Sequence, residues 1–147
     1  MYKTQTAARI LSALAALLLL LTSLTACSGG VTREETQTAS ESLFAALSEG
    51  DYEAAAALFH PDKTKTPDEL SSYCEILVTD YDVDLTDGAV IERYTGMKSA
   101  FYDSNVDGSL YELVMEIKVG DTSTIFRVQV VRNDAGFGIW NFDFVRP

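Results

Sequence analysis

The chain of 147 residues has few of the side chains that build catalytic and metal centres, with one histidine and two cysteines. These counts exclude a disulfide-rich scaffold and a zinc site made of several Cys and His residues. Basic residues are also scarce: 11 Lys and Arg stand against 22 Asp and Glu, which gives a formal net charge of −11. Such an acidic surface repels phosphate backbones, so we expect no nucleic-acid partner. A P-loop, a dinucleotide fingerprint and a nucleophile elbow are missing too, and we expect no cofactor.

The chain does have enough apolar residues for a folded core. Hydrophobic residues make up 47% of it and aromatic residues 10%. Its length allows one ordinary domain with a leader, and not two domains. We divide it into a leader at residues 1–26, a tether at 27–35 and a single domain at 36–147.

The leader has the three-part order of an export signal. Lys3 and Arg9 precede an apolar run from Ile10 to Leu24, and small residues follow. Charged, apolar and small segments in this order are typical of secretory signals. The sequence Leu-Thr-Ala-Cys at positions 24–27 resembles a bacterial lipobox. In proteins of that kind the cysteine receives diacylglycerol and the chain is cut just before it.

This resemblance implies a place for the protein in the cell. Cys27 would be the lipidation site, and the diacylglycerol would anchor the domain at the extracytoplasmic face of a bacterial cell membrane. The alternative is an uncleaved membrane helix, but residues 10–26 are fewer than the roughly 20 that a span needs. With Cys27 lipidated, Cys74 has no disulfide partner, and we expect a small buried apolar residue there.

Helical periodicity occupies the first half of the domain. The spacing of apolar residues predicts helices over about 36–49, from Asp51 to His60, and from Thr66 to about residue 78. The start of the third helix is the clearest, because Thr66, Pro67 and Glu69 combine a capping threonine, a proline at the first helical position and a capping box. The acidic run at 80–88 is predicted to be a solvated edge strand or loop.

Apolar and polar residues alternate along the second half of the domain. Odd positions from Tyr111 to Val119 are apolar and most even ones are charged, which is typical of a half-buried strand in an antiparallel sheet. Turns at 120–121 and 133–136 separate it from two more strands, and in the last strand Trp140, Phe142 and Phe144 alternate. An earlier strand is predicted between residues 89 and 102, with Gly96 as a candidate bulge.

The order of these elements predicts an α+β fold with N-terminal helices packed on a curved antiparallel β-meander. The segment from Leu43 to Ala55, with its Gly50-Asp51 loop, resembles the opening of the nuclear-transport-factor-2-like superfamily, also called SnoaL-like or cystatin-like. Residues 138–144 resemble its last strand. The resemblance implies a sheet that wraps the helices around a cavity, and it makes the open sheet face a candidate homodimer interface.

Four aromatic residues are candidates for lining such a cavity: Tyr94, Tyr102, Trp140 and Phe142. Each also lies in an alternating strand pattern, so the same residues fit a closed core. His60 is the one candidate general base, because imidazole titrates near neutral pH. Its alternative role is structural, at a helix end, where a cation interacts favourably with the last carbonyl groups.

One loop resembles the first half of a calcium-binding loop. Asp103, Asn105, Asp107 and Gly108 have the spacing of alternate oxygen ligands before a glycine turn. The twelfth position, where a bidentate acid belongs, holds Val114, and Glu112 comes two residues early. The alternative is a polar hairpin loop.

These observations favour a lipid-anchored extracytoplasmic protein without catalytic activity, which binds an envelope protein or assembles with it. The main alternative is a cavity protein that binds or transforms a small apolar ligand; a calcium-binding hairpin at 103–112 is a further alternative. A closed aromatic core would favour the first, and an open pocket with a buried acid the second.

Overall fold

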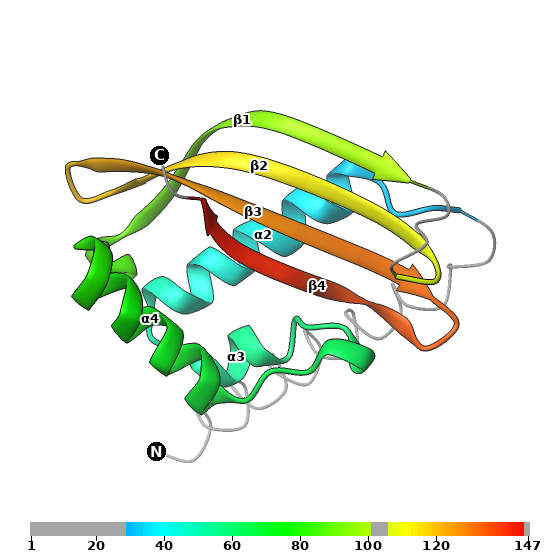
Figure 1. The fold of residues 1–147 in the computed structure, drawn as a ribbon, viewed down its shortest axis with the longest axis horizontal. Coiled ribbons are helices and arrows are strands. Elements are labelled where there is room, and N and C mark those ends of the chain that lie inside the picture. The colour runs from blue at the N-terminus through cyan, green and yellow to red at the C-terminus, as the bar shows by residue number, and fades with distance from the viewer. Residues whose placement is uncertain (1–28, 101–105, 146–147) are drawn as a thin grey trace, which may run out of the picture.

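The computed structural model describes residues 29–100 and 106–145. Helices come first and a four-stranded antiparallel sheet follows, so the predicted α+β fold is confirmed (Figure 1). The elements, including two 3-10 helices labelled η, are α2 (Arg33–Ser48), α3 (Tyr52–Ala56), η2 (Pro61–Lys63), α4 (Pro67–Tyr81), η3 (Leu85–Asp87), β1 (Ala89–Ala100), β2 (Ser109–Val119), β3 (Thr122–Asn133) and β4 (Gly136–Val145).

Capping boxes start both long helices. The Thr66 side chain accepts a hydrogen bond from the backbone of Glu69, whose carboxylate accepts one in return, as predicted for α4. Thr32 and Glu35 form the same arrangement at α2. The packed domain therefore begins before the predicted boundary at residue 36. Val31 is already buried, and its N–H donates to Ser109 Oγ at 2.7 Å.

The second helix is shorter than predicted, because α3 ends at Ala56 rather than at His60. The chain then runs beside β4 as an isolated parallel bridge. His60 N donates to Ile139 O at 2.8 Å, and Ile139 N donates to Leu58 O at 2.9 Å. Gly138 permits this approach, since a Cβ there would lie 2.6 Å from His60 N. Backbone hydrogen bonds replace the missing helical turns.

The strands follow one another in the order β1-β2-β3-β4 with antiparallel pairing. The predicted bulge in β1 is confirmed by a register shift between Tyr94 and Gly96. A second shift, between Gln129 and Val130, makes Ile139 rather than Trp140 the next paired residue in β4. The predicted alternation of Trp140 with Phe142 and Phe144 is therefore wrong, because an extra residue exchanges the two faces of a strand.

Of the two alternatives predicted for the acidic run at 80–88, an edge strand or a loop, the structure has the loop, which begins where α4 ends and contains η3. Asp82 ends α4 in the left-handed conformation, with a φ of 56°. Asp84 then caps η3 by accepting a hydrogen bond from Thr86 N. Short acidic side chains favour such caps because they bond to nearby backbone amides.

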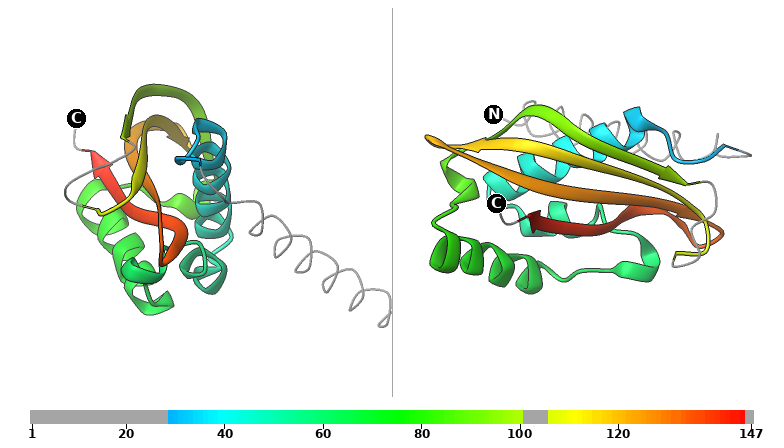
Figure 2. Two further views of the ribbon diagram at one scale, coloured as in Figure 1. Left: turned by 90° about the vertical axis from the view of Figure 1, so that its right-hand side faces the viewer. Right: turned by 45° about the horizontal axis from the view of Figure 1, so that its top comes forward.

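The sheet curves over the helices, and the core lies between the two layers (Figure 2). Leu43, Phe44 and Leu47 bury one face of α2 against the inward residues of β2 and β3. The opposite face of the sheet carries cross-strand ion pairs, Arg93 with Glu116 and Arg127 with Glu112. The meander buries mainly its inner face, as the alternation in the sequence predicts, and a small cluster that contains Leu110 and Val131 is buried on the outer face.

Candidate functional site

The single histidine is fully buried and both ring nitrogens are occupied by the backbone. His60 Nδ1 accepts a hydrogen bond from Asp62 N, and Nε2 lies 3.1 Å from Gly136 O. Because a carbonyl oxygen only accepts, Nε2 carries the hydrogen of this contact. His60 lies at the N-cap of η2 and not at the C-terminal end of a helix, which corrects the predicted helix-end position. Neither nitrogen is left to take a proton from a substrate.

The space beneath the helices is filled by aromatic rings. Phe44 meets Phe126 and Phe142 edge to face, with ring centroids 5.2 and 5.7 Å apart. Phe126 and Phe142 stack on each other with centroids 5.3 Å apart. Phe142 thus belongs to the core, and these rings occupy the position where the resemblance implies a cavity.

The other described candidates lie apart from these rings, Tyr94 at the edge of the same core and Trp140 outside it. The Tyr94 ring lies between α2 and β1, where the Arg33 guanidinium is 5.9 Å from its centroid. Trp140 packs against a separate small cluster that contains Leu110 and Val131. Tyr102 lies outside the described residues, so the described candidates do not line one site.

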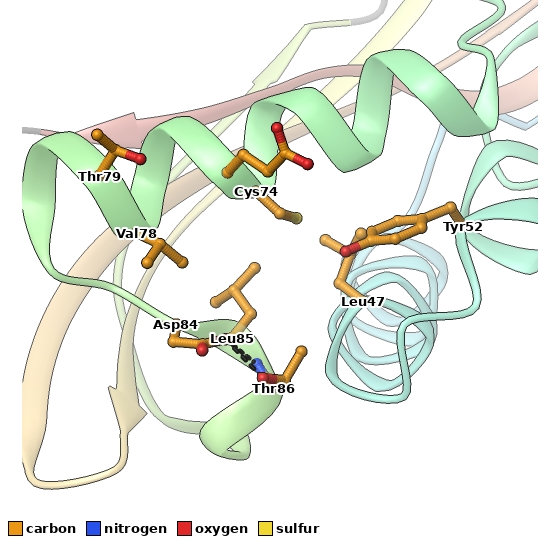
Figure 3. Close-up of a pocket in the computed structure, with 9 residues that line it drawn as sticks. Leu47, Tyr52, Cys74, Val78, Thr79, Asp84, Leu85 and Thr86 are labelled. Carbon is orange, nitrogen blue, oxygen red and sulfur yellow. Dashed lines mark hydrogen bonds between the residues drawn. The ribbon is translucent and has the colours of Figure 1, made fainter.

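A groove of about 350 Å³ opens instead between the helices and η3 (Figure 3). Leu47 and Leu85 form its apolar floor and are almost fully buried, whereas Val78 on its wall is 44% exposed. We call it the helix groove. It is defined by Leu47, Tyr52, Cys74, Val78, Asp84 and Leu85.

The Cys74 thiol and the Tyr52 hydroxyl of the helix groove keep their protons at neutral pH. Burial raises the pKa of the Cys74 thiol to about 11, and burial likewise raises the pKa of Tyr52. The charge of Asp84 acts in the same direction on both groups. A thiol held in its neutral form is a poor nucleophile. Cys74 is consequently not an activated nucleophile at neutral pH.

The candidate calcium ligands are only partly described. Asp103 and Asn105 lie outside the described residues, and Asp107 has a positive φ of 44° in the turn before β2. Glu112 accepts a hydrogen bond from Gln129 and pairs with an arginine on the outer face of the sheet. Within residues 29–100 and 106–145, no group of three or more His, Cys, Asp or Glu side chains is placed to hold a metal ion.

The proposed anchor also falls outside the described residues, because these begin at Gly29 and the lipidation candidate is Cys27. Among the helices that the structure describes, none is long and apolar enough to cross a membrane.

No family model and no curated protein matches the chain. Among solved structures, it is similar to an NTF2-like protein with a cystatin-like fold from Novosphingobium aromaticivorans. The two are 17% identical, and the match covers 91% of this chain and 88% of that chain, with a TM-score of 0.46.

Sequence reasoning missed the helix groove. Its residues come from the end of α2, the start of α3, the middle of α4 and η3, and no local motif joins them. One signal was available: Val78 is an apolar residue outside the buried stripe of α4. This signal is weak, because single exposed apolar residues are common on protein surfaces.

Proposed function

We propose that the chain is a lipid-anchored, extracytoplasmic, non-catalytic binding domain of a bacterial cell envelope, and that the helix groove is its recognition site. The observation that carries the proposal is the form of this groove, an apolar floor beside acidic side chains. A filled aromatic core leaves recognition to the surface, and the groove is the concave apolar place there.

The absence of catalytic activity is supported by the state of the two reactive side chains. His60 has both nitrogens bonded to the backbone, and Cys74 keeps its proton at neutral pH. General acid–base and thiol chemistry both need a group that can change its protonation state beside a substrate.

The occupant we propose is an apolar side chain with a basic neighbour, presented by another envelope protein. The floor of Leu47 and Leu85 suits a branched or aromatic side chain. The carboxylates of Glu75 and Asp84 line the same groove and attract a cation. Charge complementarity of this kind selects partners and speeds their encounter.

The anchor is tested by expressing the full chain in a bacterium that processes lipoproteins. Mass spectrometry should find a chain that begins at Cys27 and carries diacylglycerol, and Cys27→Ser should remain an uncleaved precursor or leave the membrane. An intact N-terminus with an unmodified thiol at Cys27 would overturn the anchor while leaving the groove untouched.

The groove is tested by protection of Cys74 from alkylation. The full-length protein in detergent micelles is treated with methyl methanethiosulfonate, a thiol-selective reagent, at pH about 8, where lysine side chains stay charged, and the Cys74 peptide is quantified by mass spectrometry. Two peptides of equal length are compared, one with lysines and one with glutamates around a central leucine. We expect only the lysine peptide to slow the reaction.

A matched pair of variants locates the effect. Val78 lines the groove, whereas Ile76 on the same helix is 50% exposed and does not. Val78→Asp should abolish the protection, and Ile76→Asp should preserve it. The proposal fails if neither peptide protects Cys74, or if the glutamate peptide protects it equally.

A second candidate function is binding of a small apolar molecule in the same groove. Its volume, about 350 Å³, lies at the lower end of the range of roughly 300–1,000 Å³ that such sites occupy. Protection of Cys74 by hexanol, without protection by either peptide, would favour this candidate.

The homodimer implied by the resemblance stays a proposal. Its candidate interface, the outer face of the sheet, carries the Arg93–Glu116 pair. Sedimentation of the full chain in micelles tests it, with Arg93→Glu as the variant. Because Glu116 would lose its partner and two uncompensated carboxylates would have to be buried at the interface of each subunit, a dimer through this face should dissociate.

A further inference from the structure

A second groove, of about 490 Å³, lies between η2 and strands β3 and β4. It shares no lining residue with the helix groove. We call it the lysine–tryptophan groove. It is defined by Asp62, Lys63, Lys65, Gln129, Trp140 and Asn141.

The indole of Trp140 is placed there by the shift in strand pairing. The extra residue in β4 turns this side chain away from the core, which Phe142 and Phe144 of the same strand join. His60 supports the indole edge-on, with ring centroids 5.2 Å apart, and Lys63 Nζ lies 5.1 Å from the Trp140 ring centroid. Bulges often re-aim a side chain in this way beside binding sites.

Two cations line the groove, and Lys65 also attracts the carboxylate of Glu69, whose pKa is lowered chiefly by the hydrogen bond from Thr66 N and further by this lysine. Among the described residues, neither Lys63 nor Lys65 forms an ion pair, whereas Arg93, Arg127 and Arg132 all do. Asp62 is the one acid that lines the groove. The lining therefore carries two cations and one carboxylate, and Glu112 and Asp143 border it through their hydrogen bonds to Gln129 and Asn141.

The two amides of the groove have acceptor capacity left. Gln129 donates its NH₂ to Glu112 at 2.6 Å, and Asn141 donates its NH₂ to Asp143. Both carboxylates orient the amides with their nitrogens directed along the sheet. Among the described residues, the Gln129 and Asn141 side-chain oxygens accept no hydrogen bond, so each can accept one from a ligand hydroxyl.

We propose that the lysine–tryptophan groove binds an acidic saccharide. The flat C–H face of a sugar ring suits the indole, its hydroxyls supply donors for the amide oxygens, and a carboxylate or other anionic substituent pairs with the lysines. An inorganic anion alone would leave the amides and the indole unused, and a neutral sugar would leave the two ammonium groups unpaired.

The single tryptophan makes the test direct, because Trp140 is the one Trp in the chain and its fluorescence reports on this groove. The full-length protein in detergent micelles is titrated with a hyaluronan tetrasaccharide, with neutral chitotetraose and with inorganic phosphate. We expect a saturable change with hyaluronan, and binding weaker by about tenfold or more for chitotetraose and phosphate.

Variants then assign the effect to the groove. Lys63→Gln with Lys65→Gln should weaken hyaluronan binding by about tenfold or more. Lys118→Gln, which removes an exposed cation from β2 outside the groove, should leave binding unchanged. Circular dichroism of each variant checks that the fold is kept.

The proposal is overturned if no saturable change occurs at millimolar hyaluronan. It is also overturned if phosphate binds as tightly, or if Lys118→Gln weakens binding as much as the paired variant does. None of these outcomes bears on the helix groove, because Cys74 protection is measured separately.

Discussion

The buried imidazole of His60 donates a hydrogen bond through Nε2 to the carbonyl oxygen of Gly136, 76 residues further along the chain. Together with the acceptor bond at Nδ1, this contact ties the segment after α3 to the hairpin between β3 and β4. His60, which the sequence suggests as a general base, therefore holds two distant segments of the fold together.

We expect His60→Ala to lower the free energy of unfolding by about 2–4 kcal/mol, because two backbone groups lose their partners and a cavity remains. Urea denaturation followed by circular dichroism measures the loss. The control is Lys63→Ala, an exposed neighbour whose ring contact is weak, which should cost less than about 1 kcal/mol. A loss for His60→Ala no greater than for the control would contradict the bracing role.

Local signals account for what the sequence predicts correctly. The capping box at Thr66 and the alternation from Tyr111 to Val119 each depend on residues within one element. Such patterns determine where a helix starts and which face of a strand is buried. The order of helices and strands, and with it the fold class, follows from them.

The remaining features depend on contacts between distant segments. The Trp140 side chain lies outside the core because the pairing of β3 with β4 shifts by one residue. The sequence of one strand does not determine how its neighbour is aligned with it. The helix groove joins residues from Leu47 to Leu85 that share no motif. His60 is buried because Gly138 lets the chain approach β4, which needs both segments at once.

The pair of Glu35 and Arg132 should make stability depend on acid. Partial burial opposes ionisation of this carboxyl, but hydrogen bonds from Arg132 and Thr32 outweigh it and lower its pKa below 4.5. A lowered folded-state pKa contributes stability that is present above the unfolded pKa and lost as the pH falls through the folded one. Solvent screening keeps the contribution to about 1 kcal/mol.

Glu35→Gln should therefore cost about 1 kcal/mol at neutral pH and progressively less as the pH falls through the lowered folded-state pKa, because the wild-type carboxyl then becomes protonated itself. Denaturation curves at several pH values test this, with the exposed neighbour Glu34→Gln as the control. A cost for Glu35→Gln that stays constant down to the lowest pH would refute the linkage.

The Cys74 thiol should react slowly until the solution is strongly alkaline. Because burial raises its pKa to about 11 from an ordinary 9.0, its thiolate fraction at pH about 8 is lower by about 100-fold. The iodoacetamide reaction rate, followed on the Cys74 peptide, should rise about tenfold per pH unit up to pH about 11. A rate that levels off near the ordinary value, while circular dichroism shows an intact fold, would contradict the effect of burial.

The packing of Phe44 against Phe126 and Phe142 should be what closes the space beneath the helices. Phe44→Ala should cost about 3–5 kcal/mol, and Phe44→Leu less, because each removes ring contacts and leaves a cavity that the core fills only partly. Phe137→Ala is the control, since that ring is 41% exposed and should cost little. An apolar cavity the size of the lost ring stays dry and accepts benzene, so benzene should raise the Tm of Phe44→Ala and leave that of the wild type unchanged. A comparable rise in the wild type would mean that the native core is already open, and it would shift the functional inference from the surface grooves to the interior.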